Sequence, residues 1–137
     1  MAKVIVYEDN FSDWHRRYGP VSKDHDLHLV AVAIPHLKSE IEFLRSEDSQ
    51  WLKEEQGYNL NPDNVQEFRN PHVPEKADIY FVDGLDGFCF EIMDLLPKDR
   101  TFLYTEDSRV QDAARQQGRE AQILKESPKD LVSRLTQ

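Results

Sequence analysis

The chain has 137 residues, of which 17 are Lys or Arg and 26 are Asp or Glu, so its net charge at pH 7 is −9. This balance argues against duplex nucleic acid as a partner, because no basic stripe offsets the repulsion from phosphates. The single cysteine, Cys89, excludes an internal disulfide. A membrane span needs about 20 consecutive apolar residues, and no apolar run here comes close to that length. The N-terminus lacks the features of a secretory signal. We therefore expect one cytoplasmic domain over residues 1–137, without membrane contact.

Two buried strands separated by a short helix are predicted in the first quarter of the chain. Lys3–Tyr7 is an apolar run rich in β-branched residues, which is typical of a strand buried on both faces. Asn10 or Ser12 can cap the following helix, and Gly19-Pro20 ends it. His28–Ile34 is predicted as the second strand.

The middle of the chain, residues 36–76, is harder to assign to elements. Apolar residues from His36 onward recur mostly at helical spacing among many charges, which predicts one long helix or two short ones. Residues 57–76 contain three prolines and several asparagines, so we expect a long excursion with at most one helical turn. This segment is therefore an enlarged region between the second and third strands.

Strands and helices alternate again in the second half. The alternation implies an α/β fold in which helices cover both faces of a five-stranded parallel sheet, joined by right-handed crossovers. The predicted strands of this half are Ile79–Val82, Thr101–Tyr104 and Ala121–Leu124, and the predicted helices are Phe88–Leu96, Arg109–Gln117 and one that starts at Ser127-Pro128.

Polar residues that could act together follow four of these five strands. In an open parallel sheet, ligands bind outside the carboxyl ends of the strands, so these side chains are expected to converge at one edge. They are Glu8 and Asp9 after the first strand, Asp83 after the third, Thr105 after the fourth and Lys125 after the fifth.

Clustered carboxylates repel one another and favour a hard divalent cation, and Mg²⁺ typically takes one or two carboxylates together with waters. A cation beside Asp83 would neutralise charge on an incoming phosphoryl group, so that this carboxylate could attack phosphorus. Lys125 and Thr105 could then contact phosphoryl oxygens. The pattern therefore favours Mg²⁺-dependent formation of an aspartyl phosphate.

These residues and their surroundings resemble the receiver domain of two-component response regulators. The resemblance implies a three-layer α/β/α sandwich with the flavodoxin-like strand order 2-1-3-4-5. It implies that Asp83 is the phosphoacceptor, Thr105 the switch hydroxyl and Lys125 the phosphate partner, and that the metal ligands are Glu8, Asp9, Asp83 and the backbone carbonyl of Leu85. The segments that carry the resemblance are Val4–Asn10, Ile79–Asp83, Phe102–Thr105, Ala113–Gly118 and Ile123–Lys125.

The leading hypothesis is a stand-alone receiver that is phosphorylated by a histidine kinase or a phosphotransfer protein and signals by contact with a downstream protein, either as a monomer or as a homodimer. Such a chain is a signalling phosphoacceptor rather than an enzyme that turns over a substrate. The chain also departs from the receiver pattern, with Glu106 after Thr105, Gln122 at a position that is often aromatic, and a short loop after Asp83. These departures favour the alternative of a pseudo-receiver that binds partners without phosphorylation. A phosphatase of the haloacid dehalogenase class fits less well, because Asp83 and Asp86 are three residues apart rather than two.

Overall fold

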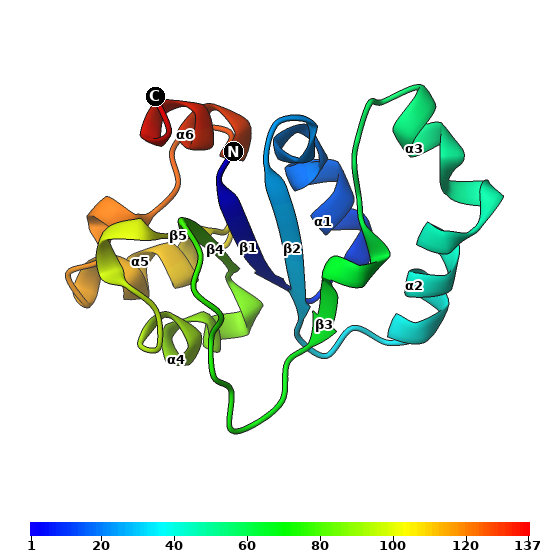
Figure 1. Cartoon of the computed structure of the whole chain (residues 1–137). Helices are drawn as coiled ribbons and strands as arrows, with labels where there is room; N and C mark the ends of the chain where they lie inside the picture. Colours follow the sequence, from blue (N-terminus) through cyan, green and yellow to red (C-terminus); the bar gives the residue numbers. More distant parts are fainter.

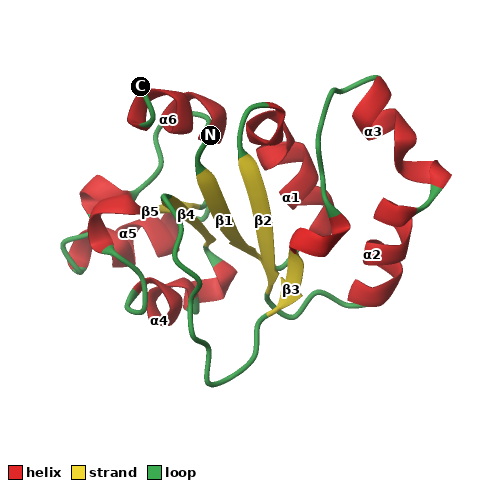
Figure 2. Cartoon of the chain, viewed as in Figure 1, coloured by secondary structure: helices red, strands yellow, loops and turns green.

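The computed structural model describes residues 1–137, and its framework is a five-stranded, all-parallel sheet with helices on both faces (Figures 1 and 2). The predicted α/β class and the parallel five-stranded sheet are therefore confirmed. The order across the sheet is β3-β2-β1-β4-β5, so β1 lies in the centre. The strands are β1 (Lys3–Glu8), β2 (Asp26–Ala31), β3 (Val65–Glu67), β4 (Ile79–Asp83) and β5 (Thr101–Tyr104).

The four strands that prediction and structure share, β2, β1, β4 and β5, lie side by side in the predicted order. The strands at the two edges of the sheet differ from the prediction. The last predicted strand, Ala121–Leu124, is reduced to one parallel bridge between Ile123 and Leu103, because residues 120–122 form a 3₁₀ turn instead. On the other side, β3 pairs with β2 inside the segment expected to hold at most one helical turn. Three residues are too few to show the alternation that marks a strand in the sequence.

β2 begins two residues earlier than predicted and ends three residues earlier. All six of its residues pair with β1, from Lys3 opposite Asp26 to Glu8 opposite Ala31. The strand ends there because the chain turns away at Ala33, whose φ of 53° lies in the left-handed region. The apolar residues that follow Ala31 therefore belong to a turn rather than to the strand.

Six α-helices complete the layers. The segment from His36 forms two short helices rather than one long one, and the helix after β4 is shorter than predicted. The longest helices have nine residues, so none is long and apolar enough to cross a membrane. The helices are α1 (Phe11–Tyr18), α2 (Leu37–Arg45), α3 (Gln50–Glu54), α4 (Cys89–Met93), α5 (Ser108–Gln116) and α6 (Pro128–Leu135).

The two faces of the sheet form two separate cores. On one face, α1 and α6 cover the sheet, and Trp14 and Tyr18 of α1 are fully buried against Phe81 and its neighbours. On the other face, α4 and α5 cover the sheet around the buried residues Tyr7 and Val82. Alternate residues of β1 and β4 therefore point to opposite cores, as expected for central strands.

The covering loop, residues 68–78, takes the place of a helix between β3 and β4 (Figure 1). Its Phe68 and His72 rings pack on the buried ring of Tyr7, and the Tyr7 hydroxyl lies 2.7 Å from His72 Nε2. Near the end of the loop, the Tyr80 hydroxyl donates a hydrogen bond to the carbonyl of Glu75. Aromatic packing and these polar contacts hold the loop against the sheet.

Phe81→Ala is expected to destabilise the protein by about 3–5 kcal/mol, because the ring is fully buried between the rings of Tyr18 and Phe102. Urea denaturation followed by circular dichroism measures the change. Val73→Ala is the control, since Val73 is 83% exposed and its truncation is expected to change stability by less than about 0.5 kcal/mol. Equal unfolding midpoints for the two variants would contradict this packing.

Candidate metal and phosphoacceptor site

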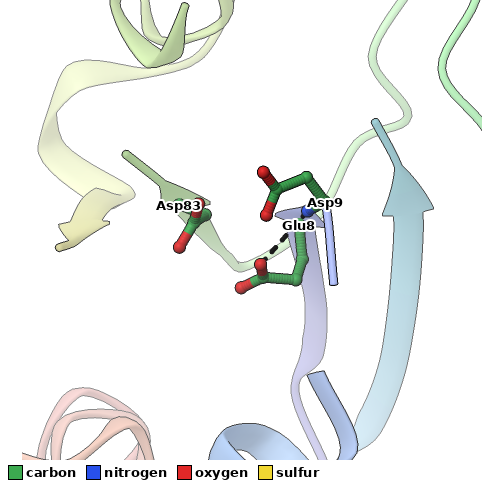
Figure 3. Close-up of side chains that lie close together, drawn as sticks. All are labelled: Glu8, Asp9 and Asp83. Atoms are coloured by element: carbon green, nitrogen blue, oxygen red, sulfur yellow. Dashed lines mark hydrogen bonds between the residues drawn. The ribbon is translucent and has the colours of Figure 1, made fainter. Parts of the chain in front are cut away.

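Three carboxylates meet at the carboxyl ends of the two central strands. Glu8 is the last residue of β1, Asp9 follows it, and Asp83 is the last residue of the neighbouring strand β4 (Figure 3). One oxygen of each carboxylate lies within 4.8 Å of the others. Glu8 is buried, Asp83 is partly buried and Asp9 is exposed, so the cluster runs from the interior to the surface. Glu8, Asp9 and Asp83 therefore lie together, as the sequence predicts.

Glu8 has one satisfied carboxylate oxygen and one unsatisfied one. Its Oε1 accepts hydrogen bonds from the backbone N–H groups of Asp9 and Asn10, at 3.1 and 3.2 Å. Its Oε2 is buried and has no hydrogen-bond partner. Burial, followed by the nearby charge of Asp83, raises the pKa of Glu8 well above its usual range. A buried oxygen without a partner is costly, and it is available to a cation.

Asp83 has two protein partners. The backbone N–H of Leu85 donates to its Oδ2 at 3.2 Å, and the guanidinium of Arg17 donates to its Oδ1 at 3.4 Å. Burial raises the pKa of Asp83, while the N–H of Leu85 acts in the opposite direction. The partly buried carboxylate of Asp83 thus lies between buried Glu8 and exposed Asp9 in its degree of exposure, and the guanidinium of Arg17 lies beside it.

Arg17 is the residue that the sequence analysis did not find. Its Nη1 lies 3.7 Å from Glu8 Oε2 and 3.4 Å from Asp83 Oδ1, and its Nη2 lies 3.7 Å from Asp13 Oδ2. Burial disfavours the charged guanidinium, but the carboxylates of Asp13 and Glu8 outweigh this effect and raise the pKa of Arg17.

The sequence did contain a signal for Arg17. Val4 and Val6 of β1 and Phe81 of β4 belong to the core that α1 covers. Because strand side chains alternate, Glu8 and Asp83 point toward the same helix, on which Arg17 lies one turn after Asp13.

Thr105 lies close to β4, the strand that ends at Asp83. It directly follows β5, whose residue Tyr104 pairs with Asp83. A Cβ atom at Gly84 would lie 2.7 Å from Thr105 Oγ1, so glycine is needed for this close approach. Thr105 Oγ1 accepts a hydrogen bond from the Asp107 backbone N–H, which leaves its own O–H free to donate. The hydroxyl is thus held next to the residue that follows Asp83.

Lys125 does not contact the three carboxylates. Its ammonium lies 2.9 Å from Glu120 Oε1, and its side chain is 65% exposed. Lys125 and Thr105 line one surface hollow of about 390 Å³. Lys125 thus forms an ion pair with Glu120 and with no other acidic residue.

The Leu85 backbone carbonyl is engaged in a tight turn. It accepts a hydrogen bond from the backbone N–H of Phe88 at 3.0 Å, while Leu85 and Asp86 both have positive φ angles of about 50° (48° and 52°). The short loop after Asp83 therefore directs this carbonyl into the turn at residues 85–88. It is a less available metal ligand than the side-chain oxygens of the cluster.

The donor set of the cluster fits a hard divalent cation. Mg²⁺ binds carboxylate oxygens at about 2.1 Å, so neighbouring ligands in its octahedral shell lie about 3.0 Å apart and opposite ligands about 4.2 Å apart. One oxygen each of Glu8, Asp9 and Asp83 lies within 4.8 Å of the others, so the three would have to draw closer together around a bound ion. The Oε2 of Glu8, which accepts no hydrogen bond, and the exposed carboxylate of Asp9 also fit a cation that retains waters on its outer side.

Comparisons of the chain with protein families, with curated proteins and with solved structures find no match.

Glu8→Gln is expected to stabilise the protein in buffer without divalent cations, by about 1–3 kcal/mol near pH 8, because it removes a buried acid that must either stay charged or take up a proton on folding. The raised pKa of Glu8 means that the folded wild type binds this proton more tightly than the unfolded chain does. Wild-type stability should therefore decline as the pH rises above about 4.5, the ordinary value for this group, and the variant should lack this part of the decline.

Chemical denaturation in the presence of a chelator, at a series of pH values, measures this difference. Glu91→Gln, at an exposed position on α4, is the matched control and should follow the wild type. If Glu8→Gln is less stable than the wild type throughout, Glu8 does not carry a burial penalty.

Proposed function

We propose that this chain is a receiver-like phosphoacceptor, in which Asp83 takes a phosphoryl group from the phosphohistidine of a histidine kinase or phosphotransfer protein. Mg²⁺ would be held by Glu8, Asp9 and Asp83. The observation that carries the proposal is the buried Oε2 of Glu8, which accepts no hydrogen bond, within a cluster that also contains Asp83. A structural carboxylate would have its oxygens satisfied by the protein, whereas a metal ligand keeps one free.

The proposed reaction would use the carboxylate of Asp83 and the hydroxyl of Thr105. One carboxylate oxygen of Asp83 attacks phosphorus and forms a new O–P bond. The P–N bond to the donor imidazole breaks, its electron pair stays on that nitrogen, and the imidazole leaves neutral when its other nitrogen carries a proton. Bound Mg²⁺ would offset the negative charge of the phosphoryl oxygens. The free O–H of Thr105 can donate to one of these oxygens.

The output of such a site would pass through contact with another protein or a second copy of the chain. Phosphorylation adds negative charge next to Thr105, which lines the surface hollow between the loop after β5 and the start of α6. A change in this hollow would be the signal that a partner reads, through a shift between two populations.

Incubation with acetyl phosphate and Mg²⁺ is expected to add one phosphoryl group to the wild type, and a chelator should prevent the addition. Asp83→Asn should remain unlabelled, because its amide is not a nucleophile. Asp86→Asn is the matched control, since Asp86 lies three residues further along and outside the carboxylate cluster. Intact-protein mass spectrometry measures the modification.

Two results would contradict the proposal. Labelling of Asp83→Asn to the same extent as the wild type would place the modification elsewhere. A wild type that stays unlabelled under conditions in which Mg²⁺ binds would remove the phosphoacceptor function. Sustained hydrolysis of a generic phosphate ester would point instead to a phosphatase.

A second candidate function is a phosphorylation-independent interaction module. Two observations favour it, the pairing of Lys125 with Glu120 and the bonding of the Leu85 carbonyl within its turn. Such a module would use the same fold and surfaces but would need no change at Asp83. The absence of labelling in the preceding experiment is the result that this candidate expects.

A further inference from the structure

The charge that faces Asp83 comes from α1 rather than from the end of the sheet. Arg17 Nη1 lies between Glu8 Oε2 and Asp83 Oδ1, at 3.7 and 3.4 Å. It is the only Lys or Arg side chain that forms an ion pair with either residue. Lys125, at the end of the predicted fifth strand, pairs with Glu120.

The guanidinium of Arg17 is held by more than the acidic cluster. Asp13 lies one helical turn earlier on α1 and faces Nη2, and the Tyr104 ring lies 4.5 Å from the guanidinium carbon. The side chain of Arg17 is only 15% exposed. A planar group packed on a ring, with one nitrogen directed to Asp13 and the other to Asp83, has little freedom to leave the site.

We propose that Arg17 is the phosphoryl-binding cation of this site and fills the position expected of Lys125. The inference rests on the proposed phosphoacceptor function. When Asp83 carries a phosphoryl group, the Nη1 that now faces its Oδ1 is in reach of a phosphoryl oxygen and can donate a charge-assisted hydrogen bond to it. Arginine suits this contact because its fork of N–H donors matches the geometry of phosphate oxygens.

The same position makes Arg17 a competitor of the metal. Its positive charge lies next to two of the three proposed Mg²⁺ ligands, Glu8 and Asp83, so it weakens the attraction of the cluster for a cation. Removal of the charge should therefore change two measurements in opposite directions. Phosphoryl transfer to Asp83 should slow down, whereas the affinity for Mg²⁺ should increase.

The test compares Arg17→Gln with Arg16→Gln, a neighbour that is 66% exposed and pairs only with Asp13. With acetyl phosphate and Mg²⁺, Arg17→Gln should be labelled about tenfold or more slowly than the wild type, while Arg16→Gln should match the wild type. Arg17→Lys should recover part of the rate, because it restores the charge without the fork. Calorimetric titration with MgCl₂ alone should give a severalfold higher affinity for Arg17→Gln than for the wild type.

Several results would overturn the inference and leave the phosphoacceptor function in place. Labelling of Arg17→Gln at the wild-type rate would do so, as would strong loss of labelling in Lys125→Gln alone. A parallel decrease of labelling and Mg²⁺ affinity in Arg17→Gln would mean that Arg17 only supports the structure. Measurements on Arg17→Lys and circular dichroism of the variants would also detect such a structural role. An unlabelled wild type that binds MgCl₂ would instead remove the phosphoacceptor function, and the inference with it.

Discussion

The parallel pairing of β1 with β4 is the constraint on which the site depends. Four consecutive residue pairs, from Val4 opposite Ile79 to Tyr7 opposite Val82, align the two central strands. Their next residues are Glu8 and Asp83, so two carboxylates far apart in the sequence end side by side. A slip of one residue would turn one carboxylate to the opposite core and separate it from the other. The register therefore fixes both the distance between these groups and the helix that they face.

That placement has an electrostatic cost, which the surrounding residues offset only in part. Two backbone N–H groups and the guanidinium of Arg17 stabilise the charges, yet Glu8 Oε2 still has no hydrogen-bond partner. The folded chain thus holds a carboxylate whose pKa is raised by burial and by Asp83. Such an arrangement is costly for stability alone, and it is typical of sites where a ligand supplies the missing charge. Arg17 provides part of that charge permanently, while a divalent cation would provide the rest.

The sequence predicts this framework well where the residues are continuous and buried. β1, β4 and β5 are apolar runs that match their observed bounds closely, and the acids at the ends of β1 and β4 follow from the rule that ligands gather at the carboxyl ends of parallel strands. The helix cap at Asn10 is also confirmed, since its side chain accepts a hydrogen bond from the N–H of Asp13.

Other features depend on contacts that local patterns do not encode. β3 exists because three residues pair with the edge of β2, and residues 121–124 form only one bridge because the preceding residues turn. Lys125 follows the last predicted strand, but its exposed side chain forms an ion pair with Glu120 and not with the cluster. Arg17 is one of two arginines in α1, and its contacts with Glu8 and Asp83 depend on how that helix packs on the sheet.

The central claim is that Glu8, Asp9 and Asp83 form one cation site, and a crystal structure of the protein soaked with Mn²⁺ tests it most directly. Anomalous scattering locates Mn²⁺ independently of the protein atoms, and this ion accepts the same oxygen ligands as Mg²⁺. One strong anomalous peak is expected, bounded by the three carboxylates. A peak elsewhere, or none between these side chains in crystals that diffract well, would contradict it.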